Sequence, residues 1–400
     1  MEIVGPLHGV RVVELSSGIS GPYCGKLLAG MGADVVKIER PRGGDSSRMV
    51  GPFPGDYPDP ESSGLFLYLN TAKQSVTIDP VTPSGSALVR QIATSADVLL
   101  ESYPPGTLDG WGLGYDVLVA DNPRLVYASV TNFGQTGPYR DFKATEITEY
   151  ALSSLMSITG EPDREPLKLG GSISLYVAGQ TAAVATLAAL YEAEESGHGQ
   201  YVDVSTLEAN VAIAEFNHVL YAYRGIIDER KGNRHANHPW GIYPCIDGWV
   251  GVIAGPTHRW GEMAKLMDER LADPRFATLP QRTEPEARDE LDAIILPWLV
   301  ERTKKEIYHA GQAHGLAFAY VATAGDLLQS EQLLTRSYFA TVDHPRVGPH
   351  TFPGAPFRCA ETPWRVERAP LLGEHNDAVL VGELGLSRAD LMCLRESGVI

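Results

Sequence analysis

The first 135 residues alternate short β-branched runs with segments of helical periodicity, and this feature limits the possible folds more than any other. The runs Val10–Leu15 and Asp34–Ile38 flank a segment of helical spacing, Gly21–Gly32. Further strands are predicted at Ser75–Ile78, Val98–Leu100 and Val126–Val130, with a helix at Pro83–Ala96. Parallel strands need such crossover helices between them. The alternation therefore predicts an α/β fold, with a parallel sheet that carries helices on both faces.

Helical periodicity dominates the segments that follow. Helices are predicted at Glu149–Gly160, Ala178–Glu195 and Leu207–Tyr223, with one strand at Tyr201–Val204. Composition changes at Arg224–His238, which is polar and basic, and the chain becomes rich in proline beyond Arg336. We therefore expect a large domain that begins over 1–223, a small α+β domain over 224–334, and an extended linker over 335–400 that returns to the large domain.

The acidic composition bears on possible partners. The formal net charge of −17 argues against nucleic acid, which requires a basic face, and against an anionic membrane surface. A ligand with a few phosphate groups remains compatible, because it needs only local cations.

Targeting and cysteine signals favour a cytoplasmic protein. Met1–Val12 lacks the charged region and apolar run of a signal peptide. No apolar stretch reaches the roughly 18 residues that span a bilayer, and the shorter run Ala182–Tyr191 is predicted to be a core helix. The four cysteines form no CxxC or Cys/His ligand pattern, so reduced thiols are expected.

The sequence gives little support for a dinucleotide-binding, hydrolase or metal site. Glu39 lies roughly 20 residues past a glycine turn, as in a dinucleotide-binding fold, but the glycines do not match G-x-G-x-x-G. No G-x-S-x-G hydrolase motif occurs. His235 and His238 lack a third ligand nearby, so we expect solvated loop residues and no metal. Lys37 and Arg40 flank Glu39, and either a surface ion-pair cluster or recognition of a ligand phosphate explains them.

An ordered series of motifs runs from about residue 6 to the end of the chain. It includes the opening Pro6–Leu15, the strand motif Gly32–Arg40, Phe133–Pro138 (FGQTGP), Gly197–Ser205 (GHGQYVDVS) and Pro370–Asn376 (PLLGEHN). Together these motifs resemble the class III coenzyme A (CoA) transferases, the CaiB/BaiF family. The resemblance implies a Rossmann-like large domain, a small domain, and two chains interlocked like linked rings. It also implies CoA or acyl-CoA as the substrate, without a metal.

The resemblance places CoA contacts on particular residues of the large domain. They are Gly18, Ile19, Arg40, Ile78, Ser102, Tyr103, Phe142, Lys143 and Thr145. Ser102 and Tyr103 replace an Asn-Phe pair of some members, and the tyrosine ring can still stack on adenine. Gly110 replaces an arginine that some members use, which weakens phosphate binding.

The sequence departs from the family at the catalytic position. Active transferases carry an aspartate just before the helix that is predicted to begin near Ala178, and its carboxylate attacks the donor thioester. Counting from Gly160 and from Gly197 places Leu175 there. Leucine offers no nucleophile and no exchangeable proton. The racemase branch pairs the same aspartate with a histidine, and Thr145 occupies that second position.

Three functions fit this departure. In the first, the chain is a non-catalytic subunit of a heteromeric CoA-transferase, as in the succinyl-CoA:benzylsuccinate type, and its partner is an aspartate-bearing paralogue in a heterodimer or heterotetramer. In the second, the chain is an active transferase with altered chemistry, using Glu146 or water. In the third, it binds acyl-CoA without turnover. The identity of the acyl group stays open.

Overall fold

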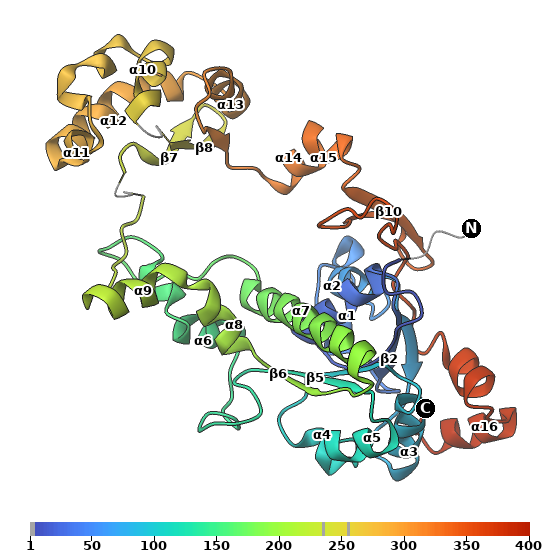
Figure 1. Cartoon of the computed structure of the whole chain (residues 1–400). Helices are drawn as coiled ribbons and strands as arrows, with labels where there is room; N and C mark the ends of the chain where they lie inside the picture. Colours follow the sequence, from blue (N-terminus) through green and yellow to red (C-terminus); the bar gives the residue numbers. More distant parts are fainter. Residues whose placement is uncertain (1–4, 234–236, 254–256) are drawn as a thin grey trace. The chain divides into compact units, whose positions relative to one another are not determined.

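The computed structural model of the chain describes residues 5–233, 237–253 and 257–400. Two compact units make up the chain (Figure 1). The large unit comprises Met1–Leu155, Lys168–Ala222 and Thr335–Ile400, and the small unit comprises Met156–Leu167 and Tyr223–Leu334. The small unit thus adds 156–167 to the segment for which the sequence predicts a small domain.

A six-stranded parallel sheet forms the centre of the large unit. Its strands, in spatial order, are β3 (Gln74–Thr77), β2 (Asp34–Glu39), β1 (Arg11–Leu15), β4 (Val98–Glu101), β5 (Val126–Thr131) and β6 (Tyr201–Ser205). Every neighbouring pair is parallel, so the predicted α/β class is confirmed. The order reverses between β1 and β4, and open sheets of this kind bind ligands outside the carboxyl ends of their strands at such a point.

Alternate residues of each strand pack into two different cores. Val12 faces a core that it shares with α1 (Ser20–Gly30) and α7 (Ile173–Ser196). Its neighbour Val13 faces the opposite core, under α3 (Pro83–Ala93), α4 (Thr107–Gly110) and α5 (Tyr115–Asp121). Figure 1 shows the two helix layers on opposite faces of the sheet. A strand buried on both faces has this pattern because successive side chains point to opposite sides.

Helix α7 is longer than the sequence predicts. Its 24 residues are long and apolar enough to cross a membrane by length and composition alone. However, Ala178, Gly179 and Ala182 are buried, and α7 packs along α1. The core-helix prediction for this segment is therefore confirmed, whereas its expected shortness is wrong.

Two predicted helices are interrupted. The helix predicted over 149–160 is α6 (Glu146–Leu152) followed by a separate 3₁₀ turn, η3 (Leu155–Ile158), because Ser154 takes a positive φ of 69°. The helix predicted over 207–223 divides at Ala214 into α8 (Thr206–Ile213) and α9 (Glu215–Arg224). The loop 42–63 contains two 3₁₀ turns, η1 (Ser46–Met49) and η2 (Pro54–Asp56), and leads into α2 (Gly64–Leu69).

The C-terminal segment is more ordered than an extended linker. It contains an antiparallel hairpin, β10 (Phe339–His344) and β11 (Gly348–Pro353), then a π-helix, η6 (Asp377–Glu383), and α16 (Arg388–Glu396). The prediction of an extended chain is therefore wrong for these parts. Asn376 accepts a hydrogen bond from the backbone N–H of Thr77 at 2.8 Å, so this segment covers the edge strand β3.

The small unit combines a three-stranded antiparallel sheet with short helices. The strands are β7 (Trp240–Cys245), β8 (Gly248–Ile253) and β9 (Ala319–Tyr320). The helices are α10 (Thr257–Leu266), α11 (Leu279–Thr283), α12 (Pro285–Val300), α13 (Lys304–Ala313) and α14 (Ala324–Leu328), with η4 (Glu269–Ala272) and η5 (Pro274–Phe276), and α15 (Glu331–Thr335) ends at the border of the unit. Its core is apolar, with Phe276, Leu291 and Phe318 almost fully buried.

His238 is buried rather than solvated, contrary to the sequence prediction. Its Nε2 lies 3.1 Å from Oδ1 of Asp292 on α12. His235 lies outside the described residues.

Candidate functional site

The predicted CoA contacts follow the ends of five parallel strands, and these strand ends all lie at one edge of the sheet. Gly18 and Ile19 follow β1, Arg40 follows β2, and Ser102 with Tyr103 follow β4. The segment after β5 carries Phe142, Lys143 and Thr145, and Ile78 follows β3. All carboxyl ends of a parallel sheet point the same way, so segments that are far apart in the chain leave the sheet at this edge.

Asp45 holds the turn that follows β1. Its Oδ1 accepts hydrogen bonds from the backbone N–H groups of Gly18 at 3.0 Å and of Ser47 at 2.8 Å. Gly18 has a φ of +82°, a conformation that glycine adopts without strain. The turn continues into α1, whose N-terminal backbone N–H groups point toward this edge and suit an anionic ligand.

A buried charge network lies beneath this turn. Lys37 contacts Oε1 of Glu14 at 2.8 Å and Oδ2 of Asp45 at 2.7 Å, and Lys73 contacts Oε2 of Glu14 at 2.7 Å. All four side chains are fully shielded from solvent. Burial opposes ionisation of Glu14, but the two ammonium groups outweigh it and lower its pKa.

Lys73 is the member of this network whose positive charge is least stabilised. Burial lowers its pKa to about 8, and the attraction of Glu14 only partly offsets that effect. Lys37 does form ion pairs, as one interpretation of the sequence predicts, but it forms them in the interior with Glu14 and Asp45. The predicted surface location is wrong, and a fully buried Lys37 is not accessible to a ligand phosphate.

Glu39 has no capacity left for a ribose. Its Oε2 accepts from Nε of Arg48 at 2.7 Å and from the N–H of Asp45 at 2.9 Å. Its Oε1 accepts from Nη2 of Arg48 at 2.8 Å and from the hydroxyl of Ser75 at 2.6 Å. This bidentate, buried arrangement explains why an acidic residue stands at the end of β2 without a dinucleotide motif.

Arg40 and Tyr103 lie on the solvent side of the edge. Arg40 is exposed, and Tyr103 is half-buried with its ring edge-on to Trp111 at 5.0 Å. Burial raises the pKa of Tyr103, and the nearby charge of Arg40 partly offsets this. A cation next to an aromatic ring is the combination that a nucleotide base and its phosphates require.

The other predicted contacts differ in exposure. Lys143 is exposed, and Phe142 is exposed and stacked on Tyr139, with ring centres 4.9 Å apart. Thr145 caps the N-terminus of α6. The side chain of Ile78 is fully buried in the core, so it does not line this edge, and only its main chain is available to a ligand.

Leu175 lies in the first turn of α7 and is half-buried. Its backbone N–H donates to the carbonyl of Ser172 at 3.1 Å. The structure thus puts position 175 at the N-terminus of a long helix, where a carboxylate would be stabilised by the helix dipole. The helix dipole does not stabilise the leucine side chain, since that side chain carries neither charge nor polar atoms.

Two carboxylates lie on the neighbouring helix α6. Glu146 pairs with Lys168, with Nζ 2.9 Å from Oε2, and 14% of its side chain is exposed. Lys168 also donates to the carbonyl of Leu169 at 2.7 Å. This ion pair occupies one of the two carboxylate oxygens of Glu146.

Glu149 is a buried carboxylate that the sequence interpretation missed. It is fully buried, and neither of its oxygens has a hydrogen-bond partner among the described residues. Burial, and then the charge of Glu146, raise its pKa to about 7. Its spacing of three residues from Glu146 on a helix was the signal available in the sequence.

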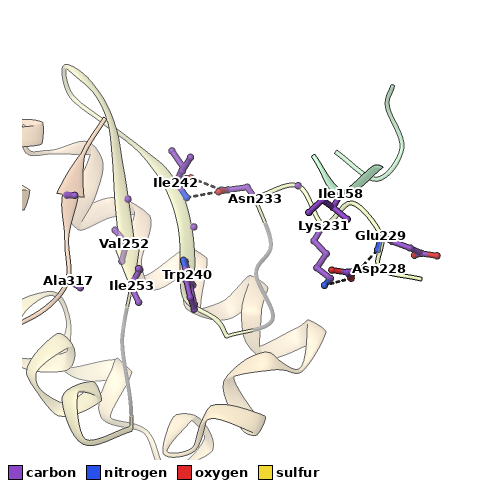
Figure 2. A pocket seen from close by; sticks show the side chains of 14 residues that line it. Ile158, Asp228, Glu229, Lys231, Asn233, Trp240, Ile242, Val252, Ile253 and Ala317 are labelled. Atoms are coloured by element: carbon purple, nitrogen blue, oxygen red, sulfur yellow. Dashed lines mark hydrogen bonds and ion pairs between the residues drawn. The ribbon is translucent and has the colours of Figure 1, made fainter. Parts of the chain in front are cut away.

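The small unit contains a cavity of about 490 Å³ beside the loop that follows Lys231 (Figure 2). Asn233 exchanges two hydrogen bonds with the backbone of Ile242 on β7, and Lys231 pairs with Asp228 at 2.7 Å. Trp240 lines the same cavity. Figure 2 shows these side chains at the border of the cavity, where Asp228 and Glu229 are the carboxylates that line it.

Metal-binding residues do not cluster in the part of the chain that the structure describes. No group of three or more His, Cys, Asp or Glu side chains there has the arrangement of a metal site. All four cysteines are free.

Comparison with known proteins relates the chain to one family over nearly its whole length. The family model for CoA-transferase family III matches residues 7–376. The chain is 37% identical to succinyl-CoA–D-citramalate CoA-transferase of Chloroflexus aurantiacus, over 99% of this chain and 98% of that protein. It is 33% identical to subunit BbsE of succinyl-CoA:(R)-benzylsuccinate CoA-transferase of Thauera aromatica, over 98% and 97%. A CaiB/BaiF family protein from Brucella suis has the same fold, with a TM-score of 0.85, 30% identity, and coverage of 95% of this chain and 99% of that one.

Proposed function

The chain belongs to CoA-transferase family III, and from this premise we propose that it is the non-catalytic subunit of a heteromeric CoA-transferase. The reaction of the complex moves CoA from an acyl-CoA donor, such as succinyl-CoA, to a carboxylic acid. Family membership supports CoA transfer as the reaction. The proposal concerns the role of this chain in that reaction, which is to bind and support without supplying the nucleophile.

Leu175 is the observation that carries the proposal. Covalent transfer of an acyl group needs a nucleophile placed against the thioester. Leu175 begins α7 at the edge where the predicted CoA contacts gather, and it offers none. A chain with this residue supplies binding surface and structure, and the nucleophile comes from elsewhere.

The residues that support the predicted CoA-binding edge are intact. Asp45 still holds the Gly18 turn, and the buried Lys37 anchors Asp45. Arg40 is exposed there, and Lys143 is exposed in the segment that follows β5, so both side chains are accessible to phosphate groups. Retention of this edge without a nucleophile favours a role in which CoA binding or the shape of the chain still matters.

An exposed apolar surface supports a partner chain. On α9, Phe216 is 70% exposed, Val219 56% and Tyr221 61%. Such a surface is typical of a protein–protein interface. We propose that an aspartate-bearing paralogue covers it in an interlocked, cytoplasmic heterodimer or heterotetramer. The relative BbsE carries the word subunit in its name, which agrees with this arrangement.

The alternative of altered chemistry rests on Glu146. Glu146 carries a carboxylate, a type of group that can act as a nucleophile, and it pairs with Lys168 at 2.9 Å. The same pairing holds the carboxylate in place, which weakens the alternative. Binding of acyl-CoA without turnover is the third candidate, and it differs from the first only in lacking a catalytic partner.

Co-expression with an aspartate-bearing family member tests the proposal. Native mass spectrometry should show a species that contains both chains in equal number, and the pair should transfer CoA from succinyl-CoA. Transfer should vanish when the partner's aspartate is replaced and should survive Glu146→Gln in this chain. A stable homodimer of this chain that turns over acyl-CoA by itself would contradict the proposal.

A further inference from the structure

Four tyrosines from separate segments of the large unit gather around the start of α7. Tyr23 on α1 meets Tyr176 on α7 edge-on, with ring centres 4.8 Å apart, and Tyr68 on α2 lies 6.4 Å from Tyr176. Tyr338, just before β10, is close enough to raise the pKa values of Tyr23 and Tyr68 after the larger effect of burial. We call these four residues the tyrosine cluster, and all four are half-buried.

Lys26 lies beside the tyrosine cluster without a counter-ion. Its side chain is almost fully buried, and Nζ lies 4.4 Å from the centre of the Tyr68 ring. Its hydrogen-bond acceptor is the hydroxyl of Thr71, at 2.8 Å. No carboxylate pairs with it among the residues that the structure describes.

An unpaired ammonium at such a depth is costly, and buried charges in proteins are normally paired. Burial and, after it, the positive charge of Lys73 lower the pKa of Lys26 to about 7. The ammonium of Lys26 therefore loses its proton more readily in the free chain than an exposed lysine does. An anion that arrives next to it would supply the missing partner and restore the full charge.

The cluster also offers hydrogen-bond donors. The structure shows no hydrogen bond between the hydroxyls of Tyr23, Tyr68 or Tyr176 and any other described residue. A phenol hydroxyl donates well to a carboxylate oxygen. Hydrogen-bond donors next to an unpaired cation are the groups with which proteins usually bind a small anion.

The position of the cluster relates it to the reacting group. Tyr176 directly follows Leu175, and Tyr23 lies in the first turn of α1, just after the Gly18–Ile19 turn. Helices α1 and α7 approach closely here, since a Cβ at Gly179 would lie 2.5 Å from the carbonyl oxygen of Ser20. The cluster therefore lies near the acyl end of a CoA ester bound along the predicted contacts.

We propose that Lys26 and the hydroxyls of the tyrosine cluster bind the far carboxylate of a short dicarboxylic acid, either free or as its CoA monoester. This inference rests on the proposed function for the position of the CoA ester, and it names the substrate class. D-citramalate and benzylsuccinate, which the names of two relatives contain, are both dicarboxylic acids.

Calorimetric titration of the full chain with succinate and glutarate, and with butyrate as the monocarboxylic control, tests the site directly. Both diacids should bind, and butyrate should bind at least about tenfold more weakly, because a charge-assisted contact is lost. Lys26→Met should weaken diacid binding by about tenfold or more, while Lys305→Met, at an exposed lysine of the small unit, should not change it. Equal binding by Lys26→Met and the unaltered chain overturns the proposal.

Proton uptake distinguishes recognition from a structural role. Diacid binding should raise the pKa of Lys26, so titrations in two buffers of different ionisation enthalpy should show protons taken up near pH 7.5. Tyr68→Phe retains the ring and the fold, and it should weaken the diacid by a smaller factor. Absence of proton uptake, or unchanged binding by Tyr68→Phe together with Lys26→Met, overturns the assignment.

Two further titrations separate the free acid from its ester. If the site serves the ester, succinyl-CoA should bind more tightly than butyryl-CoA, and Lys26→Met should remove the difference. If it serves only the free acid, the two esters should bind equally while succinate still depends on Lys26. These outcomes concern binding alone. A chain that transfers CoA unaided would end the subunit proposal and leave this site in place, whereas diacid binding that ignores Lys26 would do the opposite.

Discussion

The ammonium of Lys37 lies 2.7 Å from Oδ2 of Asp45, and both side chains are fully shielded from solvent. Through its other oxygen, Asp45 holds the backbone of Gly18. A buried ion pair thus fixes the turn from which the predicted CoA site begins.

Asp45→Asn should destabilise the chain by about 3 kcal/mol, because it leaves part of the Lys37 charge unpaired in the interior. The free energy of unfolding in urea measures the loss. Asp59→Asn is the control, since Asp59 pairs with Arg346 at the surface, and it should change stability by less than about 1 kcal/mol. Equal effects of the two substitutions would show that burial of the Lys37 pair does not matter.

Arg40→Ala should weaken CoA binding by about 1.5–3 kcal/mol, the range of a charge-assisted hydrogen bond. Arg40 is exposed beside Tyr103 at the carboxyl edge of the sheet. Arg124→Ala serves as the control, because Arg124 is exposed just before β5, at the opposite edge. Unchanged affinity of Arg40→Ala by calorimetry removes Arg40 from the site.

The chain alone should not accumulate a covalent adduct with acyl-CoA, because Leu175 offers no nucleophile. Leu175→Asp should gain one, and Leu175→Asn should not. Mass spectrometry after incubation with succinyl-CoA, with and without borohydride or hydroxylamine, detects the species. An adduct on Glu146 in the unaltered chain would instead support the altered-chemistry alternative.

Glu101→Gln should remove a pH-dependent loss of stability. Burial raises the pKa of Glu101 to about 7, and hydrogen bonds from Ser129 and Tyr103 only partly oppose it. The native state therefore keeps a proton that the unfolded chain releases near pH 4.5, so the contribution of Glu101 to stability is full below pH 4.5 and is lost as the pH rises through 7.

Glutamine stays neutral and can still accept from the N–H of Tyr103, which Glu101 binds at 2.7 Å. At pH 8 the variant should be more stable than the unaltered chain by up to about 3 kcal/mol, and at pH 4 the two should agree. Thermal unfolding across this range measures the difference. Glu194→Gln, at an exposed position, should show no such trend.

Gly179→Ala should destabilise the chain by about 1–3 kcal/mol through overpacking. A Cβ there would lie 2.5 Å from the carbonyl oxygen of Ser20 and 3.2 Å from Cβ of Tyr23, so α1 and α7 must separate. Gly110→Ala is the matched control in a helix, since nothing lies within 4 Å of its Cβ, and it should gain up to about 1 kcal/mol. Chemical denaturation compares the two. A neutral Gly179→Ala would mean that the helices adjust freely.

The elements that the sequence predicts well are those with a strong local pattern. The strands around Val12, Val36 and Leu99 follow from continuous apolar runs, and parallel order follows from the helices between them. The gathering of Gly18, Arg40 and Tyr103 at one edge could also be predicted, because every strand of a parallel sheet ends at the same side. Helix breaks at Ser154 and Ala214 could not, since they depend on single backbone conformations within apolar segments.

For the residues of the candidate site and its charged neighbours, sequence and tertiary structure each decide different features. Leu175 could be singled out from the order of motifs along the chain, because the identity of the residue at one position is given by the sequence itself. Whether Lys37 is buried, whether Glu39 is occupied by Arg48, and whether Lys26 lacks a counter-ion were decided only by the tertiary structure. The physical reason is that a charge is stabilised or stranded by groups within a few ångströms, and in this fold those groups come from segments far apart in the chain, as Glu14 and Lys73 do.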